Sequence, residues 1–472
     1  MATHFPIDVD RARKAPLAAQ IHRAIRDAIV DGRIAPGARL PSWRDLAAQL
    51  GVARGTVQAA YQRLVDEQYA VGLGAAGTRV ADRPPSSSMS GWSPDAAPLP
   101  ELFHNFGTAP LPFQLGVPSQ DAFPFVLWSR LLTREARRAA AAPVGYLDPR
   151  GDPELRKEIA AYLAIARGIR CTPSQILVTA GFSGALGLAL HGLRLEGQAA
   201  WMEDPGYPLS RTALGLSGMT VSAVPVDAEG LDVATGVRCA GGAALAVVTP
   251  GQQAPLGATM SLRRRLALLD WARRNGARVI EDDYLGELQL KGRAAPALAS
   301  LDQDGRVLHV GSFSKTISPA LRLGFLVAPP ELARAFGDLT ACLAPAPAAP
   351  VQRAVAAFLR EGHYLRHLRR MKRLYAARRE VLVGCLRELA ADVLRVEAAA
   401  AGLAVVVSLP EHAADVEIAS SALPFGLAPR PLSPWYLQSP ARRGLLLGVT
   451  NLDERRLPAD CRRLAELARR HS

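Results

Sequence analysis

The chain has 472 residues, of which 49% are hydrophobic and 21% are charged, a composition typical of globular proteins with more than one domain. No uncharged apolar run approaches the ~18 residues of a membrane span, and the first residues lack the order of a signal peptide, so we expect a cytoplasmic protein without a membrane partner. Its five cysteines are scattered without a CxxC pair, which indicates reduced thiols and argues against a disulfide framework or a metal site. The net charge of +13 suggests a polyanionic partner but does not locate the surface that would bind it.

Residues 1–80 are predicted to form three helices and a small hairpin. Apolar residues recur every fourth position over 16–30, Ser42 can cap a second helix that reaches Leu50, and a third helix runs from Arg54 to Asp66 after a turn at Gly51. Two short strands, 69–73 and 77–80, follow. A helix, a short turn, a second helix and a hairpin form a winged helix-turn-helix, whose second helix enters the DNA major groove. On periodicity alone, a small helical bundle without a DNA-binding role stays open.

The residues of this region resemble the GntR-type winged helix-turn-helix. The likeness is carried by segments 26–42, which ends in Leu-Pro-Ser, 46–52 and 56–61. The resemblance implies a double-stranded DNA operator with repeated half-sites. It further implies that the residues approaching DNA are Arg44, Arg54, Thr56 and Gly77.

Residues 81–105 are rich in Pro, Ser and Ala, a composition that cannot bury enough apolar surface to fold alone. We expect a flexible linker that lets the two halves of the chain move relative to each other.

The remaining residues alternate between short apolar runs and amphipathic helices. Candidate strands are 175–179, 244–248, 277–280, 307–310 and 321–327, and candidate helices are 155–165 and 262–274. This alternation predicts an α/β fold with a mostly parallel sheet, whose ligands bind beyond the carboxyl ends of the strands.

Lys315 is one of only five lysines in a chain with 56 Lys+Arg, and it follows the apolar run 306–310 on a serine-rich turn. Arginine keeps its proton, whereas a neutral lysine amine can attack an aldehyde and form a Schiff base. A solvated surface lysine is the ordinary alternative, but a loop between core strands favours a chemical role.

Other polar residues lie at the expected strand ends. Asp282 and Tyr284 are two residues apart in extended chain and so face the same side; the carboxylate can keep a pyridine nitrogen protonated and the phenol can hold a neighbouring ring oxygen. Tyr207 offers a flat face for stacking. A phosphate could be received by the helix start after 179–183 together with Ser312, Ser314 and Arg322.

These candidate site residues, in this order along the chain, resemble those of the fold-type I pyridoxal-phosphate (PLP) enzymes of the aspartate aminotransferase family, and the resemblance covers about residues 106–472. The resemblance implies that PLP forms a Schiff base with Lys315, that Asp282 pairs with the pyridine nitrogen and that Tyr284 contacts the 3-hydroxyl. It implies stacking of Tyr207 on the ring, and a homodimer in which Tyr146 reaches the phosphate bound by the partner subunit. It implies that Ser312 and Arg322 hold the phosphate, and that Ser314, Phe182 and Ser183 are further cofactor-binding residues.

Two positions depart from the aminotransferase pattern. Ala254 stands where the family has the Asn of Asn-Pro-x-Gly, and residues 446–448, where we expect the arginine that clamps a substrate carboxylate, are Leu-Leu-Gly. Arg442 or Arg443 could substitute. Without a bidentate clamp an amino-acid substrate loses affinity and orientation, so we expect at most partial transaminase activity.

The fusion of a GntR-type DNA-binding domain with this fold is typical of MocR-type transcriptional regulators. The resemblance implies a PLP-dependent DNA-binding regulator that senses PLP or a small amino compound. A working aminotransferase that carries a DNA-binding domain is the alternative, and a regulator that has lost its cofactor is disfavoured because Lys315, Asp282, Tyr284 and Arg322 are all present. The sequence names neither the effector nor the regulated genes, and it does not separate activation from repression.

Overall fold

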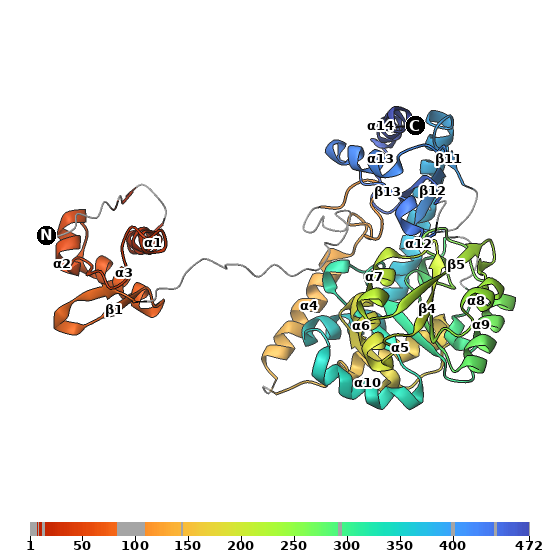
Figure 1. The fold of residues 1–472 in the computed structure, drawn as a ribbon, viewed down its shortest axis with the longest axis horizontal. Coiled ribbons are helices and arrows are strands. Elements are labelled where there is room, and N and C mark those ends of the chain that lie inside the picture. Colours follow the sequence, from red (N-terminus) through yellow and green to blue (C-terminus); the bar gives the residue numbers. More distant parts are fainter. Residues whose placement is uncertain are drawn as a thin grey trace. The chain divides into compact units, whose positions relative to one another are not determined.

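The computed structural model describes residues 7, 9–11, 15–82, 109–142, 145–290, 295–397, 402–438 and 441–471 (Figure 1). Contacts within the chain divide it into two units, Met1–Gly107 and Thr108–Ser472. None of the helices within the described ranges combines the length and the apolar character that a membrane crossing requires.

The smaller unit contains the predicted helices and hairpin. Its elements are α1 (Leu17–Val30), α2 (Trp43–Leu50), α3 (Arg54–Asp66), β1 (Ala70–Gly72) and β2 (Thr78–Val80). Ser42 caps α2 by accepting a hydrogen bond from the amide of Asp45 at 3.1 Å, and Gly51 ends it at φ +63°. The predicted core positions of α3 are buried, as are those of the neighbouring helices: Ile21, Ile25, Leu46, Val57, Ala60, Tyr61 and Leu64.

The larger unit is built on a mixed sheet of eight strands in the order β3-β10-β9-β8-β7-β4-β5-β6. Strands β4, β5, β7, β8 and β9 are parallel, while β10 lies antiparallel between β9 and β3. The predicted α/β fold with a mostly parallel sheet is therefore confirmed. The strands are β3 (Ile176–Thr179), β4 (Ala199–Asp204), β5 (Thr220–Asp227), β6 (Gly230–Leu231), β7 (Leu245–Val248), β8 (Arg278–Asp282), β9 (Val307–Ser312) and β10 (Gly324–Val327).

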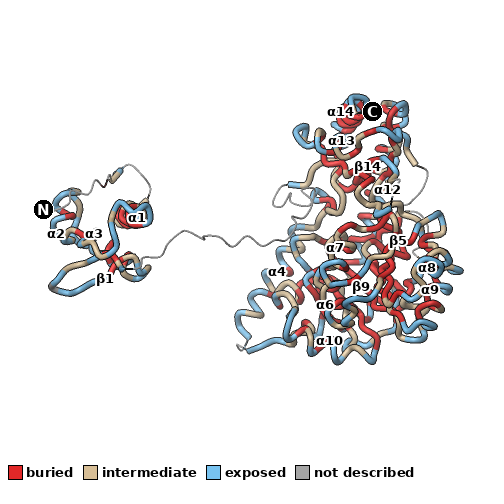
Figure 2. Tube along the Cα trace, in the orientation of Figure 1, coloured by how far each residue is buried: buried red, intermediate tan, exposed pale blue. Residues whose placement is uncertain are grey.

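Helices cover both faces of this sheet, and the buried residues lie between the layers (Figure 2). In β3, Leu177 packs on one side with α6 (Gly181–Leu193), α7 (Pro208–Leu216) and α10 (Pro330–Leu343), while Ile176 and Val178 pack on the other. This alternation follows because successive side chains of a strand point to opposite faces. The helices of the other face are α4 (Phe125–Ala140), α5 (Pro153–Ala166), α8 (Val233–Ala240), α9 (Leu262–Asn275) and α11 (Ala349–Arg360).

A second, antiparallel sheet follows in the order β11-β12-β14-β13. Its strands are β11 (Arg395–Val396), β12 (Ala404–Ser408), β13 (Arg430–Pro431) and β14 (Gly444–Gly448). The long helix α12 (His363–Leu389) packs on α11 and on α14, and α13 and α14 complete this part (Asp415–Ala422 and Leu457–Arg470).

Candidate functional site

The carboxyl ends of three strands lie along one edge of the large sheet. β8 ends at Asp282, β9 ends at Ser312 and β3 ends at Thr179. The antiparallel strand β10 begins at this same edge with Gly324, which pairs with both Ser312 and Thr179. Residues that follow these strand ends are therefore gathered in one place, the edge at which α/β sheets bind ligands.

Lys315 lies three residues beyond β9, on a turn closed by hydrogen bonds from the amides of Ile317 and Ser318 to the carbonyl of Phe313. Burial lowers the pKa of the Lys315 ammonium below its usual range, and the charge of Asp282 opposes this decrease. Its Nζ forms no hydrogen bond with any residue that the structure describes. A lowered pKa makes the neutral, nucleophilic amine more accessible at neutral pH.

Asp282 is buried and Tyr284 is half-buried near Lys315, and the charges of neighbouring groups shift the pKa of both residues. Burial raises the pKa of Asp282 well above its usual range, the charge of Asp283 adds to the increase, and Lys315 opposes it. Burial also raises the pKa of Tyr284, and the charges of Asp282 and Glu203 raise it further. The phenol therefore keeps its proton and can donate a hydrogen bond.

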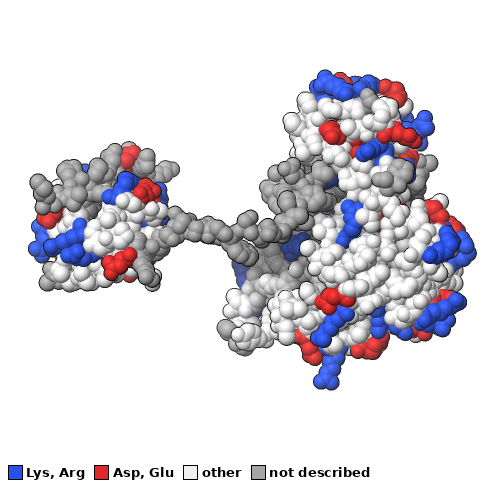
Figure 3. Space-filling view, viewed as in Figure 1, with Lys and Arg blue, Asp and Glu red and all other residues white. Residues whose placement is uncertain are grey.

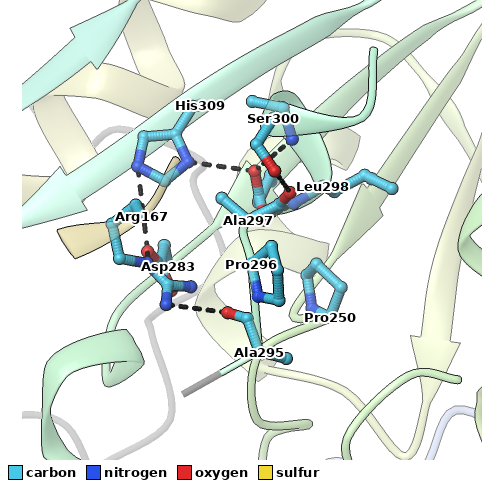
Figure 4. Close-up of polar contacts among 12 residues, drawn as sticks. Arg167, Pro250, Asp283, Ala295, Pro296, Ala297, Leu298, Ser300 and His309 are labelled. Atoms are coloured by element: carbon cyan, nitrogen blue, oxygen red, sulfur yellow. Dashed lines mark hydrogen bonds and ion pairs between the residues drawn. The ribbon is translucent and has the colours of Figure 1, made fainter. Parts of the chain in front are cut away.

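A buried network of charged residues surrounds Glu281 and Asp283, the two acidic residues on either side of Asp282 (Figure 4). Arg167, at the end of α5, binds Asp283 through two hydrogen bonds of 2.6 and 2.9 Å and donates a third to the carbonyl of Ala295. The carboxylate of Glu281 accepts the amides of residues 298 and 299 and lies 3.0 Å from Nδ1 of His309. Burial alone would lower the pKa of His309, but the hydrogen bond and charge of Glu281 outweigh it and raise the pKa.

Unlike those of its two acidic neighbours, the carboxylate of Asp282 forms no hydrogen bond and no ion pair with any residue that the structure describes. Glu281 and Asp283 each have a cation or hydrogen-bond donors, whereas the carboxylate of Asp282 forms no hydrogen bond within the described part of the chain. Arg167 and His309 were not predicted from the sequence; the one available signal is the run of three acidic residues at a buried strand end, which requires compensation.

The residues predicted to receive a phosphate surround the first turn of α6. Arg322 donates from Nη2 to the carbonyl of Ala180, at 3.1 Å, and Ser312 Oγ accepts the amide of Ser314, at 3.1 Å. A Cβ added to Gly181, the first residue of α6, would stand 3.9 Å from Ser314 Oγ. The unpaired amides of a helix N-terminus bind anions, so this arrangement suits a phosphate.

The sequence prediction for residues 321–327 needs one correction. The strand begins at Gly324 because residues 319–321 form a 3-10 turn and Arg322 adopts a left-handed backbone at φ +47°. This turn directs the guanidinium of Arg322 back toward α6.

Tyr207 brings aromatic surface to the same site. Its ring centroid lies 6.3 Å from that of Phe182 and 5.8 Å from that of Trp435. Burial raises the pKa of Tyr207 to about 12; Asp282 contributes to the increase, while Arg430 and Arg322 oppose it. The tyrosine therefore lies among the charged groups of the site and next to Phe182, which precedes Ser183 in the first turn of α6.

The position of the carboxylate-clamping arginine, which the sequence analysis placed near residues 446–448, stays a prediction. Leu446 is fully buried, Arg442 is exposed and pairs with Glu397, and Arg443 lies 3.5 Å from Asp415. Directly opposite Leu446, on β13, is Arg430, whose charge acts on Tyr207.

Arg430 and Leu446 share one face of the small sheet because paired residues of antiparallel strands point to the same side. The sequence missed Arg430 because β13 has only two residues, one of them Pro431, and shows no alternating pattern.

Tyr146 is not buried in the site of its own chain. Its side chain is fully exposed. Its contact with a partner subunit stays a prediction.

In the smaller unit, Arg44 and Arg54 are exposed near the starts of α2 and α3, and Thr56 is half-buried in the first turn of α3. Arg44 stacks on Trp43 at 4.9 Å. Gly77 adopts φ +90° in the hairpin, and a Cβ there would stand 3.4 Å from the guanidinium of Arg39, an exposed cation that the sequence prediction did not include.

Two family models match the chain. Bacterial regulatory proteins of the gntR family match residues 17–80, and aminotransferase class I and II matches residues 129–427. The probable rhizopine catabolism regulatory protein MocR of Rhizobium meliloti is 36% identical over 94% of this chain and 92% of its own length. The HTH-type pyridoxine biosynthesis transcriptional regulator PdxR of Corynebacterium glutamicum is 32% identical over 96% of each chain.

Solved structures similar to this chain include aminotransferases. The kynurenine aminotransferase of Pyrococcus horikoshii, solved with PMP, superposes with a TM-score of 0.70 at 24% identity over 78% of this chain and 93% of its own. The α-aminoadipate aminotransferase LysN of Thermus thermophilus gives a TM-score of 0.69 at 26% identity over 76% and 92%. The chain therefore belongs to the MocR-type transcriptional regulators, in which a GntR-type helix-turn-helix domain precedes a domain with the fold of class I and II aminotransferases.

Proposed function

We propose that this protein is a cytoplasmic, PLP-dependent transcriptional regulator that binds DNA and responds to PLP or a small amino compound. In this proposal residues 1–80 bind DNA, residues 81–105 are the linker, and residues 106–472 bind PLP, sense the effector and dimerise. The observation that carries it is that the side chains of Lys315 and Asp282 lie at the same strand ends and act on each other electrostatically, while neither has a hydrogen-bond partner in the described part of the chain.

The residues present fit PLP. When bound, PLP supplies an aldehyde carbon that reacts with amines and a ring that accepts electrons. Lys315 would hold the aldehyde carbon, and Asp282 would accept a hydrogen bond from the protonated ring nitrogen, which gives this carboxylate the cation that it lacks. Tyr284 would donate to the ring hydroxyl and Tyr207 would cover the ring.

The phosphate would lie at the first turn of α6. Arg322 supplies the positive charge there, and the amides of the helix N-terminus supply hydrogen bonds. The remaining members of this proposed site are Phe182, Ser183, Ser312 and Ser314.

Two copies of the chain would form the working unit. Tyr146 is exposed and free to reach the phosphate site of a partner subunit, and a dimer would present two copies of α3 to repeated half-sites in DNA. Arg44, Arg54, Thr56 and Gly77 would contact the DNA.

Arg430 favours an effector that carries a carboxylate. It shares its sheet face with Val406 and Leu446, and Leu115, Leu256 and Trp435 pack against that face. An α-amino acid would place its amine at Lys315, its carboxylate at Arg430 and its side chain on this apolar wall. Such a ligand changes DNA binding only if it binds the two conformations of the regulator with different affinity.

The test is a titration of the purified chain with PLP, followed by absorbance, and then a titration of the loaded protein with amino acids during a gel-shift assay. We expect the bound cofactor to absorb at longer wavelength than free PLP, and apolar α-amino acids to change both the spectrum and the DNA affinity. Arg430→Gln should abolish the response to amino acids but not to the corresponding decarboxylated amines, whereas Arg442→Gln should leave both unchanged. A chain that binds no PLP at all would refute the proposal.

A catalytically active aminotransferase is the second candidate, and Arg430 favours it because this arginine would supply the carboxylate clamp expected of such enzymes. Ala254, which cannot hydrogen-bond to the ring hydroxyl, and the DNA-binding unit favour the regulator. Multiple turnovers of keto-acid formation from an amino donor would decide for the enzyme.

A further inference from the structure

One helix of the larger unit carries an uncompensated row of cations. Arg366, Arg369, Arg370 and Arg373 lie on α12, and all four side chains are exposed. Their spacing of three and four residues places them on one face of the helix. No Asp or Glu occurs between residues 362 and 379, and Lys372 adds a half-buried fifth cation.

These arginines form a contiguous group without acidic neighbours on the same stretch of helix. On the face drawn in Figure 3, basic and acidic side chains are interspersed, and some exposed arginines on other helices form ion pairs, as Arg273 does with Asp270 and Arg469 does with Asp392. Among the described residues, none of the four α12 arginines forms an ion pair with a carboxylate; Arg366 donates only to the carbonyl of Glu361 and contacts a ring nitrogen of His363.

The row costs the isolated protein stability. Like charges at three- and four-residue spacing disfavour a helix. Arg366 also lies in the first turn of α12, where the helix dipole favours acidic side chains. An anionic partner that spans the row would remove both penalties.

We propose that the row on α12 binds the phosphate backbone of the DNA whose operator is bound by α3. From 366 to 373 the row spans ~10 Å along the helix, a length over which duplex DNA presents about six phosphates. Residues 83–108 lie in sequence between the described parts of the two units, and a chain of this length can span up to roughly 90 Å, so one duplex can contact both. This contact is independent of base sequence, because it involves the backbone alone.

The experiment uses the full-length protein with all four arginines changed to glutamine. Affinity is measured over a range of salt concentrations for a duplex of about 20 base pairs that holds only the selected operator and for one of about 60 base pairs centred on it. On the long duplex we expect at least tenfold weaker binding and a slope of log affinity against log salt that is lower by about 3–4, since each phosphate contact contributes about 0.9. On the short duplex we expect no change.

The matched control changes Arg462, Arg463, Arg469 and Arg470 on α14 to glutamine, which removes the same formal charge. If this control lowers the salt slope as much as the α12 variant does, the effect is one of net charge and the proposal is wrong. An unchanged slope on the long duplex overturns it as well. So does a change in oligomeric state by light scattering, which would assign the row to a subunit interface. Arg54→Ala should weaken binding to both duplexes. This variant therefore separates a loss of operator binding by α3 from a loss of backbone binding by the α12 row.

Discussion

The backbone of Gly116 lies directly against the amine of Lys315: a Cβ built on residue 116 would stand 2.8 Å from Nζ and 3.5 Å from Cε. The residue has φ +79°, and Phe113, three residues earlier, bridges to Gly448 at the end of β14. The small sheet thus holds a glycine at a position where a side chain would collide with the lysine.

Gly116→Ala should therefore weaken PLP binding by about tenfold, because the methyl group forces the lysine amine out of position. The measurement is a PLP titration followed by absorbance. Gly197→Ala is the matched control, since Gly197 has a similar φ of +76° but nothing within 4 Å of its added Cβ. Equal effects of the two substitutions would show that backbone strain, and not contact with Lys315, is responsible.

Glu203 gives the cofactor-free protein a pH dependence. Burial raises the pKa of this carboxyl to about 7, although it accepts hydrogen bonds from the amide of Thr249, at 3.0 Å, and from its hydroxyl, at 2.5 Å. The folded protein therefore holds this proton more tightly than the unfolded chain. Its stabilising contribution is complete below the ordinary carboxyl pKa and is lost as the pH rises through about 7.

Glu203→Gln should flatten this dependence, because glutamine can keep the hydrogen bonds without ionising. Between pH 5 and 8 the wild-type protein should lose on the order of 2–3 kcal/mol more stability than the variant. Urea unfolding at both pH values checks this. If the two proteins respond equally to pH, Glu203 is not the group that titrates.

The ion pair of Arg167 and Asp283 should be needed for the stability of the larger unit. Arg167→Met removes the charged hydrogen-bond partner of the buried Asp283 carboxylate and leaves it only His309, 3.8 Å away, which costs about 3–5 kcal/mol. Thermal unfolding followed by circular dichroism measures this loss. Arg273→Met, which breaks an exposed pair with Asp270, should cost less than about 1 kcal/mol. Recovery in the Arg167→Met, Asp283→Asn double variant would assign the loss to the unpaired charge; no recovery would assign it to packing.

The sequence predicted those parts of the site that follow long, regular strands. Lys315 and Asp282 come after apolar runs whose periodicity is clear, and the three helices of the smaller unit have regular apolar spacing and a recognisable cap at Ser42. Arg430 could not be found in this way, because it lies on a two-residue strand whose neighbours are set by pairing with β14.

The supporting residues were missed for a related reason. Arg167 and His309 lie 116 and 26 residues from Asp283 in sequence, and only the folded sheet and α5 bring all three together. Tertiary contacts of this kind leave no local pattern.

Arg54→Ala should weaken DNA binding and lower the slope of log affinity against log salt by about 1, as expected for the loss of one phosphate contact. A gel-shift titration at several salt concentrations measures both. Arg63→Ala is the control within the same helix, since Arg63 lies near its other end and pairs with Glu67. Binding by Arg54→Ala that matches the wild type would remove this residue from the DNA-binding surface.

The most direct test of the regulator is Lys315→Ala, measured by absorbance during a PLP titration and by gel shift with and without PLP. Lys157→Ala, on the exposed side of α5, is the control. We predict that Lys315→Ala abolishes the long-wavelength absorbance and the effect of PLP on DNA affinity, while DNA binding without PLP stays at the wild-type level. A Lys315→Ala protein that keeps both the absorbance and the response to PLP would contradict the proposed role of this lysine.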